Sequence, residues 1–118
     1  MVDGTVMLNY QDVTPAKLAQ AALTASFVTL YTVPTNARTI VKTIDVCNTT
    51  AGALQISICM VPVAGSAGTG NALVYGASVP ANSTFQWEGT QIMNNGDFIS
   101  AKGSAVGLTL TASGGEAR

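Results

Sequence analysis

From residue 26 onward, apolar and polar residues alternate in short runs that predict β-strands. The runs are rich in β-branched and aromatic residues, and turn-forming residues separate them. The segments expected to form strands are 27–33, 38–48, 53–63, 72–79, 83–88, 98–102 and 106–112. About seven or eight short strands at regular spacing predict an all-β fold, either a β-sandwich or a jelly-roll-like barrel of antiparallel strands.

The two longest runs show where the core is expected. In segment 38–48, Ile40, Ile44 and Val46 share one parity, with Lys42 as the exception, and we expect them to face the core. Segment 53–63 alternates more regularly, and its expected core residues are Leu54, Ile56, Ile58 and Met60. A turn cluster around Thr50 separates the two runs, so we expect a hairpin with both apolar faces on one side. The small-residue loop at 64–71 is flexible by composition.

The first 25 residues lack this pattern, and we expect an N-terminal arm at 1–25 ahead of a β-sandwich domain at 26–118. Segment 14–23 has two interpretations. Thr14 and Pro15 suit the N-cap and first position of a short helical turn, whereas an extended segment would lead directly into the first strand. Candidate interface residues are Met7, Leu8, Tyr10, Leu18 and Trp87. For Trp87, the core and a subunit interface both remain open.

Charge is scarce along the whole chain. Only 9% of residues are charged and the net charge is −1, whereas about 25% is usual in soluble domains. A free monomer of this kind is poorly protected against self-association, so we expect partner subunits to cover much of its surface. A neutral secreted or thermally robust domain is the alternative. The five Lys and Arg residues are scattered, which argues against nucleic-acid binding.

The apolar runs and the first residues of the chain predict neither a membrane helix nor a secretory signal. No apolar stretch approaches the roughly 20 residues of a membrane helix. The first residues lack the basic start and apolar block of a secretory signal, so we expect none.

Groups that carry chemistry are few. Histidine is absent, which removes the commonest general base and metal ligand. In the expected hairpin, Cys47 and Cys59 lie more than about 10 Å apart along the ladder, so we predict two free thiols. Asp45 and Glu88 would have to converge across a cleft to act as a glycosidase pair. We predict no catalytic, cofactor-binding or metal-binding residues, and no enzymatic activity.

Several short motifs resemble those of a known group of proteins. They are LYTVP at 30–34, IVKTI at 40–44, VCNTT at 46–50, MVP at 60–62, the loop at 65–70, NALVY at 71–75, MNNGD at 93–97 and ISAK at 99–102. Over about residues 30–114, the chain resembles small β-sandwich structural proteins of tailed bacteriophages. These motifs are mainly strand and turn signals, so they specify the fold better than the role.

The resemblance implies a virion structural protein without enzymatic activity or cofactor. Its leading form is a capsid cement, or decoration, protein that stabilises the phage head by binding between capsid subunits. The expected partners are the major capsid protein or other virion subunits, with a homotrimer favoured and with neither nucleic acid nor membrane. The protein would be made in the host cytoplasm and located on the capsid surface. The alternative is a tail, fibre or baseplate component that contacts other tail proteins or a host-surface receptor.

Overall fold

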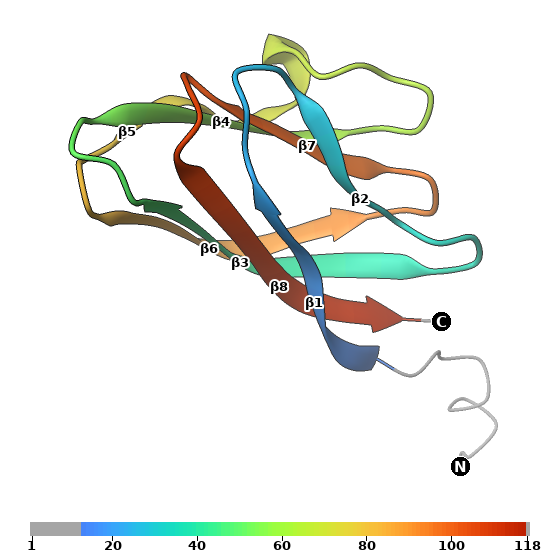
Figure 1. The fold of residues 1–118 in the computed structure, drawn as a ribbon. Coiled ribbons are helices and arrows are strands. Elements are labelled where there is room, and N and C mark those ends of the chain that lie inside the picture. Colours follow the sequence, from blue (N-terminus) through green and yellow to red (C-terminus); the bar gives the residue numbers. More distant parts are fainter. Residues whose placement is uncertain (1–12, 118) are drawn as a thin grey trace, which may run out of the picture.

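A computed structural model describes residues 13–117 of the chain (Figure 1). This range contains eight strands and one 3-10 turn, η1, at Thr69–Asn71. The strands are β1 (Val13–Ala22), β2 (Val28–Thr32), β3 (Arg38–Asn48), β4 (Leu54–Val61), β5 (Ala72–Val79), β6 (Thr84–Met93), β7 (Phe98–Gly103) and β8 (Leu108–Ala117). The predicted all-β fold is therefore confirmed.

The strands form two antiparallel sheets that face each other (Figure 1). One sheet has the order β1-β8-β3-β6 and the other has the order β2-β7-β4-β5. Apart from the β4–β5 connection, each strand is followed by one in the opposite sheet, which is the winding of an eight-stranded jelly roll. The fold is thus a β-sandwich with jelly-roll topology, and its core lies between the sheets.

The expected hairpin between segments 38–48 and 53–63 is wrong. β3 pairs with β6 and β8, while β4 pairs with β5 and β7. The buried Asn48 stabilises the connection from β3 to β4, where the chain passes from one sheet to the other. Its Nδ2 donates to the carbonyls of Gly52 (2.9 Å) and Val79 (3.0 Å), and its Oδ1 accepts from the Thr50 amide (2.9 Å). Two apolar faces can share one core from opposite sheets as well as from one hairpin, so alternation alone did not distinguish the two arrangements.

A line of bulges divides the sheet β1-β8-β3-β6. In β3, Val41 pairs with Gly114 and Thr43 with Ser113, so Lys42 is an extra residue. The register also shifts at Leu18 in β1 and opposite Lys42 in β6. An extra residue reverses which parity faces the core. Val41 and Ile44 are therefore both buried, whereas Ile40, predicted to be a core residue, lies on the outer face and is only half-buried.

The segment 13–22 is a strand, so the extended interpretation of segment 14–23 describes it and the helical turn does not. β1 pairs with β8 from Val13 to Ala22 and forms an edge of the sheet. This part of the predicted arm is therefore integral to the sandwich. The remainder of the arm, including Met7, Leu8 and Tyr10, lies outside the described residues.

The loop between β4 and β5 carries more structure than its composition predicts. Asn71 Nδ2 donates to the Ser66 carbonyl (2.8 Å), and Asn71 Oδ1 accepts from the Gly68 amide (3.1 Å). The Cys59 thiol lies 3.5 Å from the Gly68 carbonyl oxygen, so the loop lies against the outer side of β4. One asparagine thus organises a segment made mostly of small residues.

Candidate interface

Asp45 and Glu88, the pair considered for glycosidase chemistry, do not lie across a cleft. Asp45 pairs with Gln86 and Glu88 pairs with Thr43, so the two acids are diagonal neighbours on the outer face of one sheet. Diagonal neighbours in an antiparallel pair stand about 7–8 Å apart. Within residues 13–117, no three His, Cys, Asp or Glu side chains gather closely enough to hold a metal ion.

Two other acidic residues have structural partners. The Asp97 carboxylate accepts hydrogen bonds from the amides of Val63 (3.1 Å) and Asn94 (2.9 Å), which stabilises the turn between β6 and β7. Glu116 Oε2 accepts a hydrogen bond from the Tyr31 hydroxyl. These contacts explain both carboxylates as parts of the fold.

The Tyr31 hydroxyl also connects the two sheets. Tyr31 belongs to β2, and its hydroxyl lies 2.7 Å from Oγ1 of Thr39 on β3, a side chain that is fully buried. Together with Glu116 on β8, the three side chains form a polar cluster between the sheets. This cluster satisfies the hydrogen-bonding needs of Thr39 inside an otherwise apolar sandwich.

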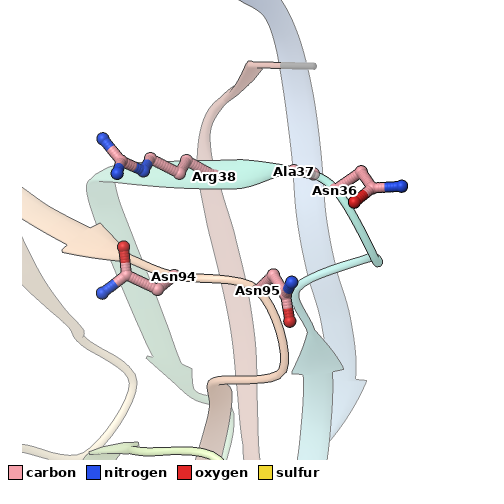
Figure 2. A pocket seen from close by; sticks show the side chains of 5 residues that line it. All are labelled: Asn36, Ala37, Arg38, Asn94 and Asn95. Atoms are coloured by element: carbon pink, nitrogen blue, oxygen red, sulfur yellow. The ribbon is translucent and has the colours of Figure 1, made fainter.

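A hollow of about 560 Å³ lies at one end of the sandwich, where the β2–β3 and β6–β7 turns meet (Figure 2). Its lining consists of Asn36, Ala37, Arg38, Asn94 and Asn95. In Figure 2 the Arg38 and Asn94 side chains extend to one side, while the Asn36 and Asn95 amides extend to the other. Amides and a guanidinium can donate hydrogen bonds but offer neither a nucleophile nor a general base at neutral pH.

The described candidate interface residues, Leu18 and Trp87, both contact the core. Leu18 is only 7% exposed and belongs to the main hydrophobic cluster. Trp87 lies opposite Ile44, is half-buried and packs against the same cluster. Leu18 is therefore not available on the surface of the domain, because the bulge at this position keeps its side chain among core residues. For Trp87, packing against the core is the observed arrangement.

An apolar row instead crosses the outer face of the sheet β1-β8-β3-β6. In β1 and β3 it lies a few residues N-terminal to the bulges. Pro15 pairs with Gly115, Gly115 with Ile40, and Ile40 with Ile92, so one residue from each strand contributes. Ile92 is 63% exposed, and Val13, one step along the outer face of β1, is 60% exposed. Single exposed apolar residues are ordinary, so it is their grouping on one face that makes this row a candidate contact surface.

Part of this row is a groove of about 250 Å³. Its lining consists of Val13, Pro15, Ile40, Lys42, Gly114 and Gly115. The two glycines on β8 contribute backbone atoms to the lining, and the Val13 side chain lies against Gly115. We call this feature the apolar groove.

Basic residues border the apolar groove. Thr39 and Ala16 face the core, so alternation turns Arg38 and Lys17 outward, and Lys42 lies in the groove lining. Glu88 is the acidic neighbour on the same face, opposite Thr43 at the line of bulges. Three of the four Lys and Arg residues in the described range are thus next to the groove.

The sequence contained one signal for this surface. Lys42 interrupts the apolar parity of 38–48, and such an interruption is what a bulge produces. A bulge at Lys42 would have predicted that Ile40 lies on the outer face and Val41 in the core. The pairing of Ile40 with Ile92 and Gly115 depends on strand order, which alternation does not contain.

The cysteines lie in different sheets, and both are free. Cys47 is exposed on β3, and Cys59 is buried on β4. The prediction of two free thiols is therefore confirmed, although the hairpin register used to reach it is not.

Comparison with known proteins leaves the family undetermined. No family model matches the chain, and no curated protein matches it. A chain of Bacillus endospore appendages, described as disulfide-linked pili, is similar at 14% identity over 91% of this chain and 88% of that one, with a TM-score of 0.49.

Two infectious bursal disease virus structures are also similar. The Gx strain matches at 14% identity over 90% of this chain, with a TM-score of 0.48, and the T13 viral particle matches at 10% over 90%, with a TM-score of 0.49. This chain spans 32% and 30% of those viral chains. Likeness at this level concerns the β-sandwich alone and carries no information about function.

No helix within residues 13–117 is long and apolar enough to cross a membrane.

Proposed function

We propose that the protein is a non-enzymatic structural subunit of a virus particle, in the form of a capsid cement protein that binds between capsid subunits. The observation that carries the proposal is the apolar row on the outer face of the sheet β1-β8-β3-β6. In a chain with only 9% charged residues, this row gives one face of the domain an apolar surface that another subunit can bury.

The mechanism is burial of apolar and neutral polar surface. Removing apolar area from water contributes about 25 cal/mol per Å² before the costs of association are subtracted. A single small contact of this kind is weak, but many copies on one shell add to a strong reinforcement. The partners are the major capsid protein and further copies of the chain, with a trimer as the favoured oligomer.

The proposal is tested on particles that carry the protein and on particles that lack it. Heating in the presence of a nucleic-acid dye reports the temperature at which the particle opens. We expect particles without the protein to open at a lower temperature, and added full-length protein to restore the original value. Equal opening temperatures with and without the protein would contradict a reinforcing role.

A matched pair of variants links that result to the apolar row. Ile92→Glu places a charge in the row, whereas Val106→Glu places the same charge at a valine that is 71% exposed on the β7–β8 loop. We expect the Val106 variant, and not the Ile92 variant, to restore the opening temperature. Counting copies per particle separates the capsid role from the tail alternative, because hundreds of copies indicate a capsid protein and a handful indicate a tail component.

A further inference from the structure

We propose that the apolar groove binds residues 1–12 of a neighbouring copy of this chain, as an extended segment that crosses the outer face of the sheet β1-β8-β3-β6. The inference rests on the proposed function in one respect, namely that copies of the chain lie side by side in an assembly. It adds which segment of the partner occupies the groove.

The lengths match. Neighbouring strands lie about 4.8 Å apart, so the apolar row from β1 to β6 is about 14 Å wide. Twelve extended residues reach about 40 Å. The segment is therefore long enough to cross the whole row, with about 26 Å of reach left for the connection to its own domain.

The chemistry of the segment matches as well. Residues 1–12 (MVDGTVMLNYQD) contain apolar side chains at Val2, Val6, Met7, Leu8 and Tyr10. An apolar side chain of the segment can pack against the apolar lining of the groove at Val13, Pro15 and Ile40.

The charges of segment and groove are opposite. The charged side chains of the segment are Asp3 and Asp12, both acidic. Lys42 lines the groove, and Lys17 and Arg38 lie on the neighbouring rows of the same face. The Lys17 and Lys42 ammonium groups donate to the neutral oxygens of Gln20 and Thr90, so their charges are not neutralised there. Opposite charges around an apolar contact favour one partner over others and fix its orientation.

The geometry of β1 favours a neighbouring copy over the same chain. β1 is paired with β8 up to Val13, which itself lines the groove. Val13 thus lies both at the start of β1 and at the edge of the groove. For residues 1–12 to cover the groove of their own domain, the chain would have to reverse direction immediately before Val13. A neighbouring copy can supply the segment without such a reversal.

Cross-linking of cysteine variants tests both the contact and its source. All variants carry Cys47→Ser, because Cys47 is an exposed thiol. One protein carries Leu8→Cys and a second carries Ile92→Cys, and a short bismaleimide joins them only if the segment of one copy reaches the groove face of the other. We expect a cross-linked dimer from this mixture and at least about tenfold less from Leu8→Cys mixed with Val106→Cys.

The outcome in a double variant decides between copies. If Leu8→Cys and Ile92→Cys react when they are in one chain, but the mixture of single variants yields no dimer, the segment covers its own groove and the proposal is overturned. No reaction in either case also overturns it.

Sedimentation of the full chain supplies an independent measurement. Placing a charge in the groove with Ile40→Glu should weaken self-association at least about tenfold, because binding would remove the carboxylate from water and bring it near the acidic residues of the segment. Val106→Glu should leave self-association unchanged. Because Ile40 is half-buried, Leu8→Lys in the segment serves as a second variant. It changes no residue of the eight strands and brings a positive charge to a groove that has basic neighbours, and self-association that survives both changes refutes the inference.

The two proposals fail separately. Cross-linking between copies without any effect on particle opening would leave the segment exchange intact and refute the cement role. Reinforcement of particles without cross-linking would do the reverse.

Discussion

Gly114 is the position at which one added methyl group should disturb the sheet most. It lies on β8 opposite Val41, and a Cβ built on it would lie 1.8 Å from the Ile40 carbonyl oxygen. Real Cβ contacts below 3.0 Å are essentially never seen, so Gly114→Ala must separate β3 from β8 locally by more than 1 Å. A ladder hydrogen bond of about 2.9 Å does not survive that separation.

The expected cost follows from these changes. Losing one or two ladder hydrogen bonds costs about 1 kcal/mol each, and strain from overpacking adds about 1–3 kcal/mol. We therefore expect Gly114→Ala to lower the free energy of unfolding by about 2–4 kcal/mol. At about 4 °C per kcal/mol, Tm should fall by roughly 8–16 °C.

The adjacent Gly115 is the matched control. A Cβ there would lie 3.1 Å from Val13 Cγ1 and 3.5 Å from the Thr14 carbonyl oxygen. The Val13 side chain is largely exposed and can rotate away, so we expect Gly115→Ala to change the free energy of unfolding by less than about 0.5 kcal/mol.

Both variants are followed by Trp87 fluorescence and circular dichroism, during heating and in urea, at one protein concentration. Equal Tm values for Gly114→Ala and the unmodified protein would refute the close approach of β3 and β8. Equal losses in both variants would refute the assignment of the clash to Gly114.

Three further predictions concern the interior. Tyr31→Phe should lower the free energy of unfolding in urea by about 1–3 kcal/mol, because it removes the hydrogen-bond partner of the buried Thr39 hydroxyl. Tyr75→Phe at an exposed site should lower it by less than about 0.5 kcal/mol, and similar losses in both variants would exclude a bridging role for Tyr31. Asn48→Ala should lower the free energy of unfolding by roughly 2–4 kcal/mol, since its side chain holds the crossing between sheets; an unchanged urea midpoint would argue against this role. Without reductant, a maleimide should label Cys47 alone in the folded protein and both Cys47 and Cys59 in denaturant; two labelled thiols in the native state would contradict the burial of Cys59.

The alternation of apolar and polar residues predicted the core face correctly where the strand has no bulge. The alternation of Leu54, Ile56, Ile58 and Met60 predicted the core face of β4 correctly, because a regular strand presents every second residue to the same side. The same rule failed in β3, where the extra residue Lys42 reverses the parity. In segment 14–23 the sequence left a helical turn and an extended segment open. Pro15 suits the first turn of a helix and also an edge strand, and propensity alone does not say that a sheet edge is present.

For the apolar row, too, the sequence predicted one aspect and not another. The scarcity of charge led us to expect a covered surface from composition alone, and this expectation stays a prediction. The positions of that surface were not predictable, because Ile40 and Ile92 lie more than fifty residues apart and meet only when β3 pairs with β6.

The sequence by itself determined that the chain forms short antiparallel strands around one apolar core, because strand period and turn chemistry are local properties. Only the tertiary structure decided which strands are neighbours, where the bulges align, and therefore which apolar residues remain outside. Strand order depends on contacts distant in sequence, and a one-residue bulge in one strand shows its effect only against its partners.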